Sequence, residues 1–355
     1  MSRKALRPVV IAAVAILTGA LLAACSSSGK TSNQGGNDAA GSSFPLTITD
    51  ASGQKLTLQK KPEAIGCYWT GCDEILAALG VVPHASPNAV DTTKGKLIYP
   101  NGLPEQDVNK LGGEDNAESW AKAGVDLIVT RGPASPEVKA FEAVAPVLYL
   151  YAPGLDDSGK LTGLEAYKKN VELMGQVTGK VAEAKAANDG FDTFMTKLAS
   201  KAPAGAADTT VAPIFQTDDG TYQLIAPTSA FCVALNQYKL GKCAESSARN
   251  ATSWVVNSEA FLALNPGWIP YMGGANGTAL DWKRRGDAVW KQLTAVKDQH
   301  VYNATSRIFC CSLRTLAPSL QEYAYNAWGA NSGIADPGKV TDYVYADDYS
   351  PLSAK

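Results

Sequence analysis

Apolar residues recur at intervals of three or four between residues 161 and 200, a spacing typical of amphipathic helices. The apolar positions of this stretch are Leu164, Tyr167, Val171, Met174, Val181, Ala184, Phe191, Phe194 and Leu198. Thr178-Gly179, followed by Glu183, indicates that one helix stops and another starts. We therefore predict one helix that ends near Val177 and a second from about Lys180 to Lys201, roughly 30 Å long at about 1.5 Å per residue.

Short apolar runs alternate with helical segments before this stretch. Residues 46–58 alternate apolar and polar positions around Asp50-Ala51-Ser52-Gly53, which predicts a β-hairpin. The next expected strands are residues 64–67, 126–130 and 146–151, and a helix is expected at residues 73–79 with Gly80 as its stop. Because each strand is followed by a turn and a helix, the sheet should be mainly parallel.

The segment after residue 204 repeats this plan. Its expected strands are residues 211–217, 221–225, 268–271 and 300–303, and its expected helices are residues 229–238, 258–265, 287–293 and 318–328. The pattern predicts an α/β fold whose parts are an N-terminal lobe at 45–177, a long linking α-helix at 178–203, a C-terminal lobe at 204–345 and a tail at 346–355. Parallel sheets place ligand loops at the carboxyl ends of their strands, an edge that we call the rim of each lobe. The expected rim residues are Tyr68, Trp69, Arg131 and Tyr151 in the first lobe and Gln216, Tyr271, Met272, Arg307 and Arg314 in the second. We expect a ligand cleft between the two rims.

The N-terminus has the pattern of a bacterial lipoprotein signal. Arg3, Lys4 and Arg7 precede an apolar run from Val9 to Leu22, and the run ends in Leu22-Ala23-Ala24-Cys25. We expect residues 1–24 to be a signal peptide and Cys25 to carry the lipid, including palmitate. Residues 25–44 are rich in Ser, Gly, Asn and Ala and are expected to be a flexible tether. The alternative is an uncleaved anchor, but the apolar run is shorter than the ~20 residues that a span needs.

Composition agrees with an exported protein body that is held at the extracytoplasmic face of the cell membrane by its lipid. The chain has 32 Lys and Arg against 34 Asp and Glu, so charge gives no reason to expect binding to nucleic acid or to an anionic bilayer. Only two histidines and four methionines are present, which argues against a bound zinc or manganese ion.

Six cysteines remain beside Cys25, an even number in an oxidising compartment. Cys67 and Cys72 bracket Tyr68-Trp69, Cys232 and Cys243 bracket a short segment, and Cys310 and Cys311 are adjacent. We expect three disulfides between these neighbours, although sequence alone does not fix the connectivity. A purely structural role for all three is favoured over redox chemistry.

Four motifs follow the lipobox and hairpin in order: Lys61-Pro62-Glu63-Ala64-Ile65-Gly66, Glu74-Ile75-Leu76-Ala77-Ala78-Leu79-Gly80, Gly124-Val125-Asp126-Leu127-Ile128-Val129 and Gly175-Gln176-Val177-Thr178-Gly179. Together with the lipobox and hairpin, they resemble the substrate-binding lipoproteins of iron–siderophore, haem and cobalamin ABC importers. The resemblance runs from about Phe44 to Trp328, and the cysteine pair around Tyr68-Trp69 is most similar to actinobacterial iron-siderophore binders. It implies two Rossmann-like lobes on one long helix, which close only slightly on a ligand.

The resemblance also implies two residues that dock on the permease. In this family each lobe carries a surface Glu, in the helix before a strand, that meets arginines of the permease. Glu118 precedes the strand near Asp126, and Glu259 precedes the strand near Trp268, so both occupy matching places. Both are also favourable first-turn positions for a carboxylate, which is the ordinary alternative.

Ferric siderophores are bulky, partly apolar and often anionic, so aromatic walls and arginines suit them. The candidate ligand-binding residues are Tyr68, Trp69, Arg131, Trp254, Tyr271, Arg307 and Arg314. The ordinary alternative is that the aromatics fill cores and the arginines solvate the surface. The segment around Cys310-Cys311 is unusual for the family and puts the transferred geometry there in doubt.

We therefore expect a monomer that is not an enzyme, has no cofactor, and delivers a ferric siderophore to an ABC permease and its ATPase. Haem is the close competitor, with Tyr68 or Tyr271 as axial ligand, and cobalamin is third. From other classes, the alternatives are an exported thiol oxidoreductase using Cys310-Cys311 and a structural lipoprotein. The usual catalytic motifs are absent from the sequence.

Overall fold

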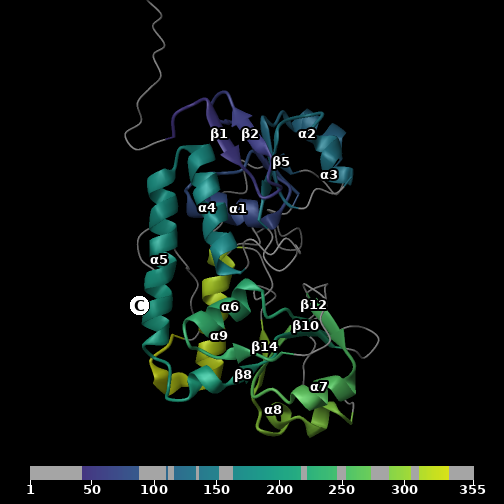
Figure 1. The fold of residues 1–355 in the computed structure, drawn as a ribbon, viewed down its shortest axis with the longest axis vertical. Helices are drawn as coiled ribbons and strands as arrows, with labels where there is room; N and C mark the ends of the chain where they lie inside the picture. Colours follow the sequence, from purple (N-terminus) through teal and green to yellow (C-terminus); the bar gives the residue numbers. More distant parts are fainter. Residues whose placement is uncertain are drawn as a thin grey trace, which may run out of the picture. The chain divides into compact units, whose positions relative to one another are not determined.

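The two expected helices at the middle of the chain are present as α4 (Leu164–Thr178) and α5 (Val181–Ala199), side by side in Figure 1. The computed structural model describes residues 42–87, 109–110, 116–132, 136–151, 163–216, 222–245, 253–272, 288–304 and 312–335. Gly179 ends α4 with a φ of 71°, which glycine adopts without strain, and the Lys180 N–H donates to the Gly175 carbonyl at 2.7 Å. The break predicted at Thr178-Gly179 is confirmed.

The first lobe contains a hairpin and a five-stranded parallel sheet. The hairpin pairs β1 (Leu46–Thr49) with β2 (Lys55–Leu58), as predicted. The sheet has the order β5-β4-β3-β6-β7, and its strands are β3 (Ile65–Cys67), β4 (Ala85–Ser86), β5 (Asn109–Lys110), β6 (Leu127–Arg131) and β7 (Val147–Leu150). Sequence reasoning missed β4 and β5 because a two-residue strand is too short to show a periodic pattern.

The second lobe also has a five-stranded sheet, but this one is mixed. Its order is β12-β10-β9-β13-β14, with strands β9 (Ile214–Gln216), β10 (Tyr222–Ile225), β12 (Ser253–Val256), β13 (Ile269–Met272) and β14 (Val301–Ala304). β9, β13 and β14 run parallel, whereas β10 is antiparallel to both β9 and β12. Only a few residues join β9 to β10, and a parallel pair needs a connection of about a dozen residues or more.

Two further details of this lobe differ from the prediction. The strand expected at 211–217 is split into β8 (Thr210–Val211) and β9, because Pro213 between them has no N–H to donate. β8 pairs with β11 (Lys242–Cys243) in a small separate sheet. The helix expected at 287–293 is replaced, within the described residues, by the 3₁₀ turn η3 (Trp290–Gln292) and the short α8 (Thr294–Lys297).

Helices cover both faces of each sheet. The helices of the first lobe are α1 (Thr70–Ala78), α2 (Ala117–Ala123) and α3 (Pro136–Phe141). The helices of the second lobe are α6 (Ala230–Gln237), α7 (Ser258–Leu264) and α9 (Leu313–Trp328), and this lobe also has the 3₁₀ turns η1 (Ala206–Asp208) and η5 (Ala330–Ser332). α9 begins five residues before its predicted start at Pro318. Ser312 forms a capping box with Thr315, so the proline lies inside the helix and not in its first turn.

Within the described residues, three apolar cores hold the fold together. One lies between the first sheet and α2 and α3, and contains Trp120, Phe141 and Tyr149. A second lies between the second sheet and α7 and η3, and contains Tyr222, Phe261 and Trp290. The third and largest is continuous from the first sheet through α1, α4, α5, α6 and α9. The two lobes therefore share one core along these helices, and residues 39–355 form one compact unit.

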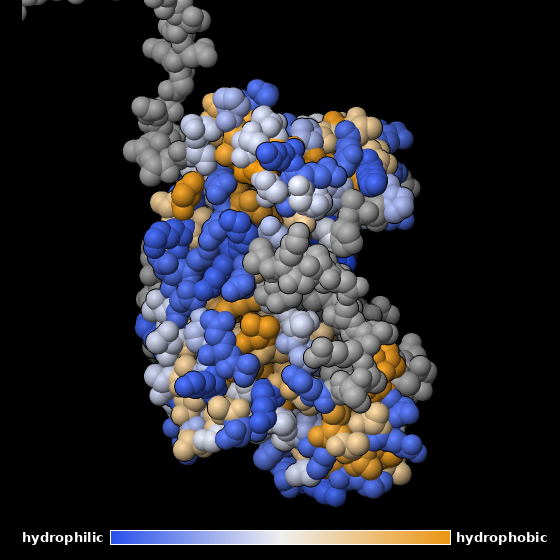
Figure 2. Space-filling model, viewed as in Figure 1, coloured by the Kyte–Doolittle hydropathy of each residue, from blue (hydrophilic) through white to orange (hydrophobic). Residues whose placement is uncertain are grey.

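The outer surface of α4 and α5 is hydrophilic. It carries the ion pairs Lys169–Glu172, Lys180–Glu183 and Lys185–Asp189 and appears as a blue area in Figure 2. In the part of the chain that the structure describes, none of the helices has the length and hydropathy needed to cross a bilayer. The division of the folded part at residues 177 and 203 remains a prediction.

Candidate ligand-binding site

Three of the predicted rim positions lie at one edge of the first sheet. β3, β6 and β7 are parallel neighbours, and Tyr68, Arg131 and Tyr151 lie at their carboxyl ends. The register is fixed by the Tyr68 N–H, which donates to the Val129 carbonyl at 2.9 Å. Arg131 is exposed, while Tyr68 and Tyr151 are half-buried. This edge therefore presents one cation and two phenols together, as expected for an anionic, partly aromatic ligand.

The adjacent residues Tyr68 and Trp69 belong to different cores. Tyr68 packs edge-on against Phe141 at a centroid distance of 5.1 Å and against Trp120 at 6.4 Å. Trp69 is buried in the shared core, where it precedes the first turn of α1. Only Tyr68 of the two keeps a partly exposed ring at the sheet edge, so it remains the better candidate for ligand contact.

The disulfide Cys67–Cys72 encloses this Tyr68-Trp69 turn. The two α-carbons are 5.4 Å apart, and the Cys72 N–H donates to the Trp69 carbonyl at 2.8 Å. A second disulfide joins Cys232 in α6 to Cys243 in β11. Both expected local pairings are therefore present. Cys310 and Cys311 lie outside the described residues, and so do Cys25 and Arg307.

The aromatic candidates of the second lobe are placed differently. Tyr271 is only 1% exposed and packs against Trp290 at a centroid distance of 5.8 Å, inside the core of that lobe. The expectation that Tyr271 lies on the rim is therefore corrected: it fills the core, as large aromatics commonly do. Trp254 lies in β12 opposite Leu224, and nothing is described of its side chain.

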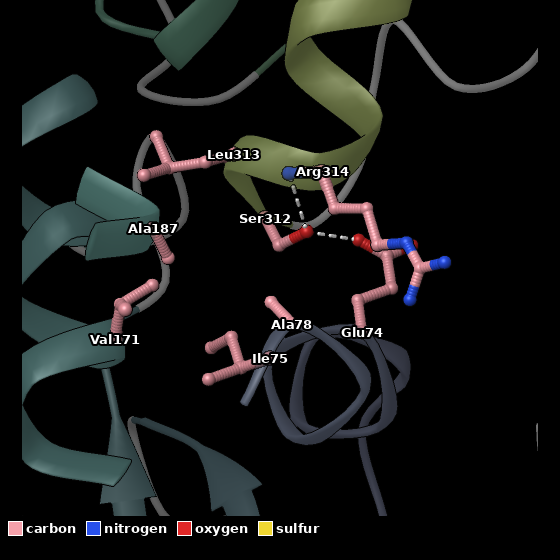
Figure 3. Close-up of a pocket in the computed structure, with 8 residues that line it drawn as sticks. All are labelled: Glu74, Ile75, Ala78, Val171, Ala187, Ser312, Leu313 and Arg314. Atoms are coloured by element: carbon pink, nitrogen blue, oxygen red, sulfur yellow. Dashed lines mark hydrogen bonds between the residues drawn. The ribbon is translucent and has the colours of Figure 1, made fainter. Parts of the chain in front are cut away.

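Arg314 lies at a junction between the lobes. It is in the first turn of α9, is 8% exposed, and lines a small cavity together with Glu74, Ile75, Ala78, Val171, Ala187, Ser312 and Leu313 (Figure 3). The cavity has a volume of about 10 Å³, which is about enough for one water molecule. This cavity is too small to hold a ferric chelate. The junction at Arg314 is therefore a packed contact between the lobes and not the ligand cleft itself.

Two buried carboxylates on α1 were missed by sequence reasoning. The Asp73 carboxylate accepts a hydrogen bond from Ser86 Oγ at 3.0 Å, and burial raises the pKa of Asp73 well above its ordinary value. Glu74 accepts hydrogen bonds from Ser312 and Thr315 of α9. A signal was present in the sequence: these are the only charged residues of a nine-residue helix that is otherwise apolar or small.

Tyr167 of α4 connects this junction with the sheet edge. It is buried, and its pKa is raised first by burial and then by the Glu74 carboxylate, with the Arg131 guanidinium opposing. Both charges therefore act on the same phenol. Among the described residues no group of three His, Cys, Asp or Glu side chains could hold a metal ion.

The two predicted docking glutamates occupy similar positions in their helices, and Glu118 is also ion-paired with Lys122 at 2.9 Å. Glu118 lies in the first turn of α2 behind the N-cap Asn116, and its side chain is 75% exposed. Glu259 is exposed in the first turn of α7 behind the N-cap Asn257. Each asparagine accepts a hydrogen bond from the backbone N–H three residues on, at 3.0 and 2.8 Å. Both helices have seven residues and end at a left-handed residue.

A model of the periplasmic binding protein family matches residues 67–308. The chain belongs to the periplasmic binding protein family. The matched residues run from the start of the Cys67–Cys72 disulfide to just before α9. The resemblance seen in the sequence is thereby confirmed at the level of the family.

A lipoprotein of Bacillus subtilis shows the same relationship. The chain is 25% identical over 285 residues to the uncharacterized ABC transporter substrate-binding lipoprotein YvrC of Bacillus subtilis, which covers 79% of this chain and 85% of the relative.

Two solved structures share the fold of this periplasmic binding protein. The triscatecholate siderophore binding protein FeuA from Bacillus subtilis, in complex with ferri-bacillibactin, aligns with a TM-score of 0.64 and 16% identity, covering 80% of this chain and 99% of FeuA. DesE, a ferric-siderophore receptor protein from Streptomyces coelicolor, aligns with a TM-score of 0.60 and 18% identity, covering 79% of this chain and 97% of DesE. At sequence identities of 16% and 18%, the similarity to FeuA and DesE shows that the fold is shared.

Proposed function

We propose that this chain is a solute-binding lipoprotein that captures a ferric siderophore between its lobes and delivers it to an ABC permease. The observation that carries the proposal is the placement of exposed Arg131 beside half-buried Tyr68 and Tyr151 at one edge of the first sheet. An arginine fork binds carboxylate, hydroxamate or catecholate oxygens, and phenol rings pack on the ligand's apolar parts. FeuA, in complex with ferri-bacillibactin, and DesE, a ferric-siderophore receptor protein, support the same ligand class.

The lipid anchor and the transport partners belong to the same proposal. Cys25 would carry the lipid that holds the protein at the extracytoplasmic face of the membrane, and the lipoprotein relative YvrC supports this. Glu118 and Glu259, each exposed in the first turn of a capped helix, would dock on basic residues of the permease. A cytoplasmic ATPase would then drive the permease, and the chain itself would catalyse no reaction.

Tryptophan fluorescence of a soluble variant that begins after Cys25 tests the proposed ligand class. The ligands are a ferric hydroxamate, a ferric carboxylate siderophore, ferric citrate, haemin and cobalamin, with inner-filter controls for each. We expect saturable quenching by one ferric chelate at sub-micromolar concentration. Saturation by haemin with a tyrosinate-to-iron absorption band would assign the protein to haem uptake, and Tyr68 would then be tested as the ligand. If none of these ligands gives saturable quenching, the proposal is overturned.

A further inference from the structure

One buried carboxylate joins the two lobes. Glu74 of α1 belongs to the first lobe, and its Oε2 accepts hydrogen bonds from Ser312 Oγ and, at 3.1 Å, from Thr315 Oγ1 of α9 in the second lobe. These residues are about 240 positions apart in the sequence, and Glu74 is 1% exposed. A carboxylate at that depth is tolerated only when hydrogen bonds replace its lost hydration.

The start of α9 is well suited to receive this carboxylate. Ser312 is the N-cap, and its Oγ accepts from the Arg314 N–H at 3.0 Å while its own N–H donates to Thr315 Oγ1 at 3.4 Å. Glu74 therefore extends a capping box with an acid from the opposite lobe. α9 has 16 residues, and the positive end of its dipole adds a favourable interaction with negative charge.

The surroundings make this contact strong and specific. Arg314 from the first turn of α9 and Glu74 from α1 both line the cavity, while Ile75, Val171 and Leu313 face it on the other side (Figure 3). Apolar walls exclude water and so strengthen the hydrogen bonds between Glu74 and α9. Asp73, the neighbouring acid, bonds instead to Ser86 in the first lobe, so Glu74 alone of the two contacts α9.

We propose that Glu74 is a latch that holds the N-terminus of α9 against α1, limits how far the lobes separate on the helical side, and positions Arg314 at the junction. The latch acts in the protein without ligand. Only its consequence for ligand affinity, through Arg314, rests on the proposed function.

Hydrogen–deuterium exchange of the ligand-free protein tests the latch. In Glu74→Ala the amides of residues 314–317 should exchange roughly tenfold to a hundredfold faster, as expected for loss of hydrogen bonds to a charged group, while residues 323–328 keep their rate. The matched control is Ser229→Ala, which removes the N-cap of α6 and should leave residues 314–317 unchanged. A general loss of stability would instead raise exchange in α7 as well.

Two further variants keep the test decisive if Glu74→Ala does not fold. Glu74→Gln keeps the side-chain length and one acceptor oxygen, and Ser312→Ala removes the donor. Both changes act on the same contact between Glu74 and Ser312. In the double variant Glu74→Gln with Ser312→Ala, the amides of residues 314–317 should therefore exchange no more than about twofold faster than in the faster single variant. Unchanged exchange at residues 314–317 in Glu74→Ala or in Ser312→Ala, or effects that multiply in the double variant, would overturn the latch whatever ligand the protein binds.

Discussion

The side chain of Asn170 and the backbone of Tyr151 form a closed pair of hydrogen bonds. The Tyr151 N–H donates to Asn170 Oδ1, and Asn170 Nδ2 donates to the Tyr151 carbonyl, both at 2.8 Å. Asn170 is fully buried in α4, whereas Tyr151 follows β7 at the edge where we place the ligand. This pair of bonds fixes the end of the strand to a central helix.

Asn170→Ala should therefore lower the free energy of unfolding by about 3 kcal/mol, because it leaves the N–H and the carbonyl of a partly buried residue without partners. Urea unfolding followed by circular dichroism measures the change. Asn326→Ala is the control: its amide donates to the Glu322 carbonyl within the same helix, and about 0.5 kcal/mol is expected. Equal losses in the two variants would contradict a special role for the Asn170–Tyr151 pair.

Asp73 should make stability depend on pH. Burial raises its pKa in the folded state, so the folded protein keeps this proton at pH values where the unfolded chain has released it. Its contribution to stability is therefore greatest below about pH 4, the unfolded pKa, falls as pH rises towards the folded pKa, and stays low above it. Asp73→Asn keeps an acceptor for Ser86 Oγ and removes the titration.

Melting temperatures at pH 4 and pH 7 test this sign. The difference between Asp73→Asn and the parent should shift in favour of the variant as the pH rises. The exposed Asp298 supplies the control variant Asp298→Asn, for which no such shift is expected. Parallel melting curves for Asp73→Asn and the parent across this range would show that burial does not perturb Asp73.

Reversing the charge of both docking glutamates should separate transport from binding. Glu118→Arg combined with Glu259→Arg would place cations opposite basic residues of the permease, so uptake should be abolished while ligand affinity stays unchanged. Uptake of a labelled chelate by cells and fluorescence titration of the purified protein measure the two effects. Glu137→Arg, in the first turn of α3, is the matched surface control. A loss of affinity in the double variant would contradict the docking role.

Arg131 should contribute to ligand affinity. Arg131→Gln removes the exposed cation at the carboxyl end of β6 and should weaken binding of an anionic ferric chelate by roughly tenfold or more. Lys139→Gln removes an exposed cation from α3 and should leave the dissociation constant unchanged. If both variants bind like the parent, the ligand does not contact this edge of the sheet.

The two disulfides should differ in their effect on binding. Cys67→Ser with Cys72→Ser should cost about 2 kcal/mol of stability, as expected for a short loop, and should also weaken ligand binding because the loop carries Tyr68. Cys232→Ser with Cys243→Ser should cost about 3 kcal/mol and leave affinity unchanged. Denaturant unfolding measures the stability of both variants, and ligand titration measures their affinity. If the two variants bind the ligand equally well, the loop that carries Tyr68 does not contribute to the site.

Local patterns in the sequence were sufficient for much of the fold. The break between α4 and α5 follows from Thr178-Gly179, the hairpin from its alternation, and the parallel first sheet from the strand–turn–helix order. These features depend on interactions between residues close together in the chain. For the same reason the sequence placed Tyr68 and Arg131 at one edge of one sheet.

Only the tertiary structure decided which side chains are buried and which elements meet. Tyr271 and Arg131 both lie on strands, yet one fills a core and the other is exposed, because burial depends on the layers packed above each strand. From the sequence, Glu74 is expected to be an ordinary acidic residue of a helix. Its hydrogen bond with Ser312 is seen only in the tertiary structure, where α9 from the far end of the chain packs near α1. Sequence patterns report local geometry, whereas contacts across hundreds of residues depend on how the lobes pack.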